Sequence, residues 1–188
     1  DKDELPEPML KKRSELFMDA NKQRILENPD EAIKLYKKVL DIDPDHAPSL
    51  YELARLYAGQ GRAEDAVLLL EKAIGLEKDN VWYKLELAEI YKRSRQFEKL
   101  IGIYEELIEK YPEKIDYYYD LALAYMIMGD YREAIDTYDQ IEEKIGVTER
   151  ISLQKQKLYL NQDKTGKALE EVEKLVEAYP ENTRYLQI

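Results

Sequence analysis

The feature that most constrains the fold of this chain is a sequence period of 34 residues. Small, apolar and aromatic residues recur at this step along most of the chain, and no insertion or deletion disturbs the register. Such a period indicates a stack of similar units, each burying its apolar face against its neighbours. The recurring sets are Ala32, Ala66, Leu100, Ala134 and Ala168; Ala20, Ala54, Ala88 and Ala122; and Tyr57, Tyr91, Tyr125 and Tyr159.

The spacing inside each unit predicts two amphipathic helices. In the third unit, Leu87, Ala88 and Tyr91 lie on one face of a helix, and Leu100 and Tyr104 repeat this spacing on a second helix. Applied to every unit, the pattern predicts helices at roughly 9–27, 30–43, 47–59, 63–76, 81–94, 97–110, 115–128, 131–144, 149–161 and 165–178.

Glycine and proline residues mark the predicted helix ends. Gly61 and Gly129 lie between the two helices of their units, where glycine permits a left-handed backbone at the helix end. Pro44, Pro112 and Pro180, each 68 residues apart, follow the second helix and stop it. The glycine and proline positions therefore agree with the 34-residue period on where one unit ends and the next begins.

The pattern resembles the tetratricopeptide repeat family over residues 13–182, in repeat length, register and small-residue positions. This resemblance implies an all-α fold, a right-handed α-solenoid of about five stacked antiparallel helical hairpins. The implied repeats are about 13–46, 47–80, 81–114, 115–148 and 149–182.

The first and fifth repeats depart from the family pattern. Asp19 and Gln23 stand where the first repeat should have leucine and tyrosine. Lys155 and Gln156 replace the leucine–alanine pair of the fifth repeat. Helix pairing is therefore less well defined by the sequence at the two ends of the array than in its middle.

The two ends of the sequence suggest a piece of a longer protein. Residues 1–8 are polar, contain two prolines and are expected to be a flexible segment before an array that spans 9–182. Residues 183–188 are expected to begin a truncated sixth repeat. The chain also resembles, in general style, repeat proteins of the bacterial cell envelope, which favours an envelope or periplasmic location over the cytoplasm.

Composition narrows the classes of function. A net charge of −11 opposes the binding of nucleic acid. No apolar run reaches the roughly 20 residues of a membrane span, so no direct membrane insertion is expected. With no cysteine and one histidine, His46, the sequence contains no recognisable catalytic, metal or cofactor site. We therefore expect a protein without enzymatic activity, cofactor or metal.

The resemblance also implies where a partner would bind. In the family, the first helix of each repeat lines a concave groove, and its exposed positions contact a protein or peptide. Several of these positions here are aromatic residues or arginine, the types that dominate binding hot spots. The predicted groove residues are Tyr51, Arg55, Trp82, Glu86, Glu89, Arg93, Tyr119, Leu123, Met126 and Ile127.

The sequence favours a protein-binding scaffold but leaves two alternatives open. One is a structural spacer that self-associates through its exposed ends. The other is an accessory domain of an enzyme whose catalytic part lies outside these residues. A repeat fold serves many functions, so the fold by itself does not decide among them.

Overall fold

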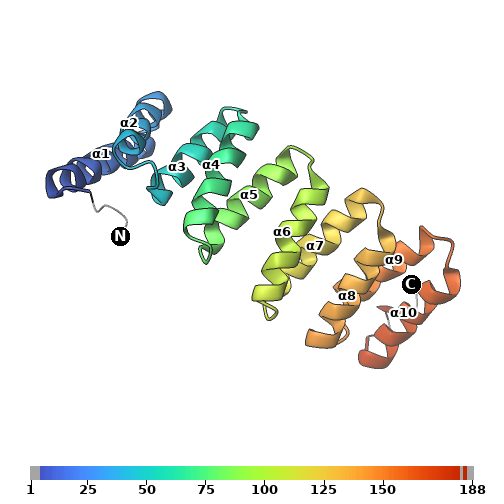
Figure 1. The fold of residues 1–188 in the computed structure, drawn as a ribbon. Coiled ribbons are helices and arrows are strands. Elements are labelled where there is room, and N and C mark those ends of the chain that lie inside the picture. The colour runs from blue at the N-terminus through green and yellow to red at the C-terminus, as the bar shows by residue number, and fades with distance from the viewer. Residues whose placement is uncertain (1–4, 183, 186–188) are drawn as a thin grey trace. The chain divides into compact units, whose positions relative to one another are not determined.

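Ten α-helices and no strand make up the part of the chain that the computed structural model describes, residues 5–182, 184 and 185 (Figure 1). The all-α prediction and the helical-repeat architecture are therefore confirmed. The helices are α1 (Glu7–Ile25), α2 (Pro29–Ile42), α3 (Ala47–Gly59), α4 (Ala63–Leu76), α5 (Val81–Arg93), α6 (Phe97–Lys110), α7 (Ile115–Met128), α8 (Tyr131–Ile145), α9 (Glu149–Leu160) and α10 (Thr165–Ala178).

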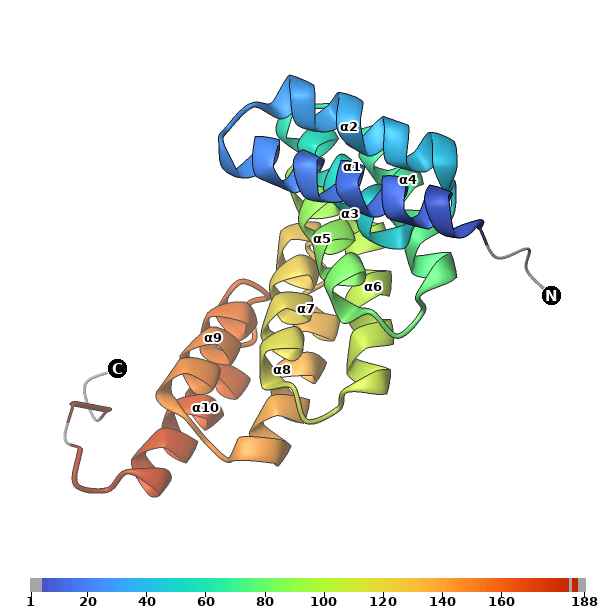
Figure 2. The same cartoon turned by 90° about the vertical axis from the view of Figure 1, so that its left-hand side faces the viewer.

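The helices form two compact units, Asp1–Arg95 and Gln96–Ile188. In the first unit, α1 packs against α2 and α3 against α4, and α2 and α4 each contact the helix that follows. Figure 2 shows the antiparallel α1 and α2 side by side. In the second unit, each helix from α6 to α9 contacts the next one in sequence. Both units are therefore built from neighbouring antiparallel helices.

Buried alanines lie where the helices approach each other. Ala54 and Ala66 are fully buried in the first unit, as Ala122 and Ala134 are in the second. A side chain of this size lets two helix backbones pack closely, with larger residues filling the space around it. In the second unit the surrounding core is Tyr118, Ile135, Tyr138, Ile141, Ile151 and Leu158.

One turn conformation recurs within every helical pair. A left-handed residue ends the first helix of each pair, and in four of the turns the next amide donates to the carbonyl five residues earlier, as from Arg62 to Tyr57 and from Asp130 to Tyr125, both at 2.9 Å. This closes the preceding helix in a Schellman motif. The left-handed residues, each 34 apart, are Glu27 (φ 58°), Gly61 (79°), Arg95 (58°), Gly129 (85°) and Asp163 (57°).

The helix boundaries differ from the sequence-based ranges by two residues at most. The largest difference is at α1, which covers 7–25 rather than 9–27. Pro8 fits in the first turn of α1, where a missing amide hydrogen costs nothing, so the helix starts before it. At the other end, the left-handed backbone of Glu27 stops the helix early. The prediction that all of 1–8 precedes the helix is therefore wrong for residues 7 and 8.

Both predicted terminal segments fall partly outside the described residues. Residues 1–4 belong to the expected flexible segment, and 183 and 186–188 to the expected sixth repeat. Of the latter segment, Tyr185 is described: its side chain is 5% exposed and its ring centre lies 6.0 Å from that of Tyr179. The sixth repeat stays a prediction.

A buried lysine explains how the fifth repeat packs without its leucine. Lys155 occupies the register of Leu53, Leu87 and Leu121, yet its side chain is 1% exposed. Its ammonium group lies among three carboxylates on the helices either side of α9, at 2.5 Å from Asp139, 3.0 Å from Glu142 and 2.9 Å from Glu171. Lys174 also contacts Glu142 and Glu171, at 3.3 and 3.0 Å. Paired charge therefore replaces apolar packing here.

We predict that Gly129→Ala destabilises the protein by about 1 kcal/mol, because alanine must adopt the left-handed backbone. Gly102→Ala is the matched control: it lies within α6, where an added Cβ meets no heavy atom within 4 Å. This change should stabilise by about 0.5–1 kcal/mol, because alanine favours a helix. Urea unfolding of both variants checks the pair, and equal stabilities would contradict the turn assignment.

We predict that Lys155→Leu destabilises the protein by about 3 kcal/mol, although it restores the residue typical of the other repeats. The substitution leaves Glu142 and Glu171 mostly buried without their central cation. Lys157→Leu, at an exposed position of the same helix, should change stability by less than about 0.5 kcal/mol. Denaturant unfolding of both variants measures the difference, and a Lys155→Leu protein as stable as wild type would exclude a stabilising role for this network.

The same network predicts a loss of stability in acid. Burial alone would raise the pKa of Glu142, but hydrogen bonds and charge from Lys155 and Lys174 lower it below its usual 4.5. A carboxyl whose pKa is lower in the folded state adds stability above its unfolded pKa and loses it as pH falls. The difference in melting temperature between wild type and Glu142→Gln should therefore shrink between about pH 7 and about pH 3. A constant difference would contradict this assignment.

Candidate protein-binding surfaces

The ten predicted groove residues lie on first helices of the repeats, but they belong to two units. Six lie in the first unit, on α3 and α5, which contact each other. We call these the Trp82 surface: Tyr51, Arg55, Trp82, Glu86, Glu89 and Arg93. The other four lie on α7 in the second unit, and we call them the α7 surface: Tyr119, Leu123, Met126 and Ile127.

Charges on the first unit form a ladder across successive first helices. Arg24 of α1 lies 3.3 Å from Glu52 of α3, and Arg55 lies 3.4 Å from both Glu52 and Glu86 of α5. The four side chains are partly exposed, so the ladder orders the surface more than it stabilises the fold. The repeat pattern predicts that these residues lie on first helices, but it does not show which of their side chains meet between helices.

The two aromatic residues of the Trp82 surface have different surroundings. Tyr51 is half-buried: its ring centre lies 5.0 Å from that of Tyr83 in the core, and the Arg55 guanidinium lies 5.6 Å above it. Burial, together with Glu86 and Glu52, raises the pKa of Tyr51 despite the opposing charge of Arg55. Trp82 is 67% exposed. Tyr51 therefore supports the fold, whereas most of the indole is available to a partner.

The end of α5 adds one exposed ion pair to this surface. Glu89 and Arg93 stand one helical turn apart and their side chains meet at 2.8 Å. Both are well exposed, so the pair contributes only a few tenths of a kcal/mol, about 0.3–0.5, to the helix. Across the Trp82 surface, the acidic and basic groups are thus already paired with one another.

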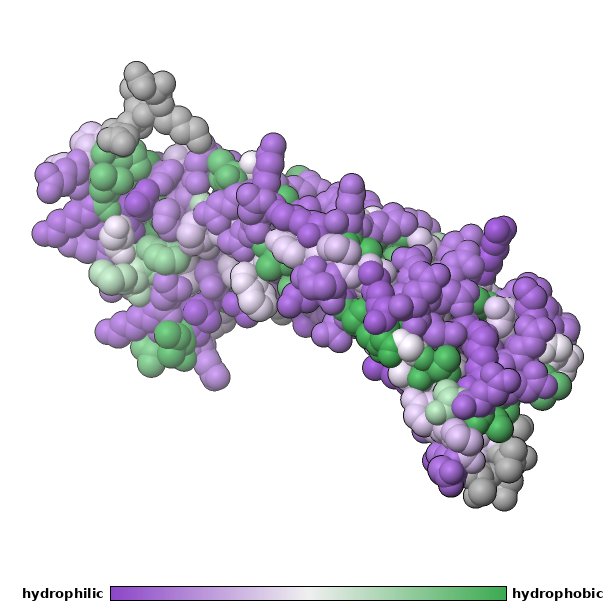
Figure 3. All heavy atoms as spheres, turned by 90° about the horizontal axis from the view of Figure 1, so that it is seen from below, coloured by the Kyte–Doolittle hydropathy of each residue, from purple (hydrophilic) through white to green (hydrophobic). Residues whose placement is uncertain are grey.

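The α7 surface is more apolar. Leu123 is 42% exposed and Ile127 49% exposed, at positions one turn apart on the helix. Met126 is half-buried, and its sulfur accepts a hydrogen bond from the Tyr138 hydroxyl at 3.6 Å. The face drawn in Figure 3 is mostly hydrophilic, with separate hydrophobic patches among the polar residues.

Tyr119 at the start of this surface is covered by a cation. The Arg150 guanidinium of α9 lies 3.8 Å from the centre of its ring, close enough for a cation–π interaction. Tyr119 also lies beside Tyr138, with ring centres 6.3 Å apart and ring planes at 62°. Tyr119 is therefore held by two neighbours, and the exposed apolar area of the α7 surface comes mainly from Leu123 and Ile127.

His46, the one histidine of the sequence, has a structural role at a helix start. The Nδ1 atom of His46 accepts from the Ser49 amide at 3.3 Å and so caps the start of α3. Within residues 5–182, 184 and 185, no group of three or more histidine, aspartate or glutamate side chains is placed to hold a metal ion. None of the helices described there has the length and apolarity of a membrane span.

An all-α array of helical pairs with exposed side chains on its first helices defines the class of a helical-repeat interaction protein. Three models of the tetratricopeptide repeat family match the sequence, over residues 25–73, 85–114 and 103–136, together more than half of the chain. The chain belongs to the tetratricopeptide repeat family. No curated protein sequence matches it significantly.

Solved structures of repeat proteins share this fold. A MamA protein is 25% identical, with a TM-score of 0.68, covering 92% of this chain and 95% of its own. YrrB, described as a TPR protein with an unusual peptide-binding site, is 18% identical, with a TM-score of 0.66 and coverage of 96% and 97%. A tetratricopeptide repeat protein from Parabacteroides merdae is 18% identical, with a TM-score of 0.69 and coverage of 93% and 70%.

Proposed function

We propose that this chain is a non-catalytic scaffold that binds a protein or peptide partner through the exposed faces of its first helices. The observation that carries this proposal is Trp82, a tryptophan whose side chain is 67% exposed beside a set of ordered charges. Tryptophan offers a large apolar area with one polar donor, and it is enriched among the residues that dominate binding energies.

The paired charges around Trp82 suit recognition of a partner. Because Arg55 already contacts Glu52 and Glu86, a partner would gain little from simple charge attraction at this surface. Its affinity would come mainly from burying the indole, and the charge pattern would select orientation and partner. Two observations support these separate roles for the indole and the charges. The charges are held at defined positions by their ion pairs, and the Trp82 indole among them is exposed.

The α7 surface would add a second contact of a different kind. Leu123 and Ile127 present adjacent apolar side chains, which suit the apolar face of a partner helix or an extended apolar segment. The same side chains would also serve contacts between two copies of this chain. Sedimentation at increasing protein concentration separates these uses, because self-association raises the apparent mass without any partner.

The relatives support the general class of this function. Tetratricopeptide repeats typically bind protein partners along surfaces built from successive repeats. YrrB, which shares the fold, carries a peptide-binding site. These relatives do not specify which residues of this chain would bind, so the Trp82 surface is proposed from its own geometry.

We predict that Trp82→Ala weakens the binding of selected peptides by at least about tenfold, as expected for a hot-spot tryptophan. Peptides would be enriched from a displayed random library on the wild-type chain, and their dissociation constants measured by fluorescence anisotropy. Trp82 is the residue to change because Tyr51 packs against the core, so its loss would also disturb the fold.

Leu68→Ala provides the matched control for this experiment. Leu68 lies on α4 in the same unit and is 66% exposed, so the substitution removes a similarly exposed apolar side chain from a second helix. Binding to this variant should stay within about twofold of wild type. Enriched peptides that bind Trp82→Ala as well as wild type would refute the proposed site.

A further inference from the structure

A pocket in the first unit lies between the turn that joins α3 to α4 and the end of α5. Its volume of about 280 Å³ is just below the range typical of sites for whole small molecules, so it suits a single side chain. Of its apolar residues, Ile90 is buried, with 3% of its side chain exposed. The residues that line the pocket are Ala58, Gly61, Ala63, Ile90, Arg93 and Ser94.

A small residue at the start of α4 leaves this space open. Ala63 is the first residue of α4, and the same register holds Phe97 at the start of α6 and Tyr131 at the start of α8. Both rings are half-buried, and Tyr131 packs against the core of the second unit. The first and fifth repeats hold Pro29 and Thr165 there. An aromatic ring thus takes this position in the two repeats that follow, and the second repeat lacks it.

Arg93 lines the pocket with its charge only partly engaged. Its Nε atom donates to the Glu89 carboxylate at 2.8 Å, which orients the guanidinium. The two terminal nitrogens of Arg93 make no hydrogen bond or ion pair within the part of the chain that the structure describes. They can therefore donate to a second carboxylate, and the planar guanidinium favours such paired hydrogen bonds.

The charge at this end of α5 favours an acidic ligand. Residues 90–96 contain three bases, Lys92, Arg93 and Arg95, and no acid, although the chain as a whole carries a net charge of −11. Lys92 and Arg95 are exposed, and neither forms an ion pair with any residue whose placement is described. A carboxylate that approaches Arg93 therefore meets an excess of positive charge close by in the sequence.

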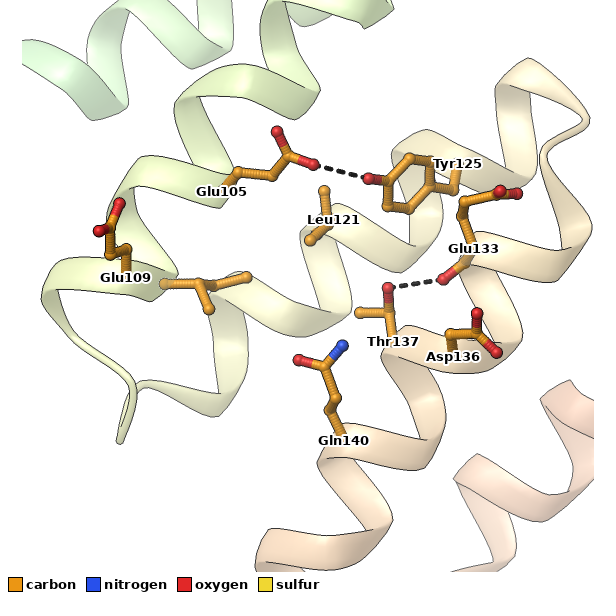
Figure 4. Close-up of a pocket in the computed structure, with 9 residues that line it drawn as sticks. Glu105, Glu109, Leu121, Tyr125, Glu133, Asp136, Thr137 and Gln140 are labelled. Atoms are coloured by element: carbon orange, nitrogen blue, oxygen red, sulfur yellow. Dashed lines mark hydrogen bonds between the residues drawn. The ribbon is translucent and has the colours of Figure 1, made fainter.

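A larger pocket among α6, α7 and α8 lacks this combination (Figure 4). Its volume is about 330 Å³. There the Tyr125 hydroxyl donates to Glu105 at 2.8 Å, and the Thr137 hydroxyl donates to the backbone carbonyl of Glu133 at 2.7 Å. The acidic side chains around it are exposed and solvated. The smaller pocket differs from it by pairing a missing ring with a partly engaged arginine.

We propose that the pocket beside Arg93 binds a phenylalanine side chain of a peptide partner, and that Arg93 binds an acidic residue next to it in the peptide. This inference rests on the proposed function, because Arg93 belongs to the Trp82 surface. The ring would contact Ile90 and take the register position that Phe97 and Tyr131 hold in the following repeats. Trp82 lies eleven residues earlier on α5, about 16 Å along the helix, and would contact another part of the same partner.

The test is an NMR titration of the full chain with the capped peptide acetyl-Ser-Phe-Glu-Ser-amide at about 0.15 M salt, where long-range attraction is screened. A buried ring with one ion pair supports a dissociation constant on the order of 1 mM, which such a titration can measure. We expect saturable shifts at the amides of Ala63, Ile90 and Ser94. Alanine in place of the peptide phenylalanine should weaken binding by at least about tenfold, and glutamine in place of its glutamate by about threefold.

Two variants of the chain locate the effect, each with a matched control. Ala63→Phe supplies the missing ring in cis and should weaken the peptide by at least about tenfold, whereas Ala178→Phe, at the exposed end of α10, should change binding by less than about twofold. Arg93→Gln should remove the preference for glutamate over glutamine in the peptide. Arg132→Gln, which also loses an exposed arginine paired one turn away, should keep that preference. Thermal melting checks that all four variants fold.

Several outcomes would overturn the proposal. These are absence of saturable shifts, shifts centred away from the pocket, equal binding of the alanine or glutamine peptide, unchanged binding by Ala63→Phe, and an unchanged glutamate preference in Arg93→Gln.

Trp82→Ala separates this proposal from the proposed function. The four-residue peptide is too short to reach from the pocket to Trp82, so this variant should bind it within about twofold of wild type. If the short peptide fails while the library peptides still need Trp82, only the pocket assignment is wrong. If the short peptide binds as expected while the library peptides do not need Trp82, the pocket assignment stands and the Trp82 site is wrong.

Discussion

Close packing of helices at buried alanines is the constraint on which the rest of this structure depends. Positions such as Ala54 and Ala122 carry no exposed area, and a larger side chain there would push the helices apart. A single helical pair also leaves an apolar face uncovered, so each pair needs the next one in sequence. Side chains that face away from these contacts are free of packing demands and available for binding.

Tyrosines link the packed interior to the polar surface at the repeat junctions. Tyr57, Tyr91 and Tyr125 each interact with a charged residue 20 positions earlier, on the second helix of the preceding repeat. Lys37 lies 5.8 Å from the Tyr57 ring, and Glu105 accepts a hydrogen bond from Tyr125. Glu71 raises the pKa of Tyr91 in addition to burial. The same position beside the tyrosine therefore holds a cation in one repeat and a carboxylate in two others.

Two groups of charged residues differ from the other repeats, one buried around Lys155 and one exposed on α6 and α8. The Lys155 network places its charges inside the protein, where every group depends on its partners and a wrong neighbour is costly. It therefore restricts what can pack against α9 to helices that supply carboxylates. Glu105 and Glu109 of α6 and Glu133 and Asp136 of α8, by contrast, are exposed acidic residues whose charge is solvated. The first arrangement specifies the fold, and the second stays in contact with solvent.

The sequence alone determined the helices, their pairing and the class of protein, because these follow from a strict local period. Alanine, glycine and proline positions set the helix ends to within two residues, as with α4 and α7. The sequence also placed Tyr51 and Trp82 on exposed helical faces, but treated them as equivalent. Only the tertiary structure showed that Tyr51 packs on Tyr83 whereas Trp82 is mostly exposed. Likewise, the burial of Lys155 and the meeting of Glu105 with Tyr125 depend on side chains from different helices, whose contacts a periodic pattern does not specify.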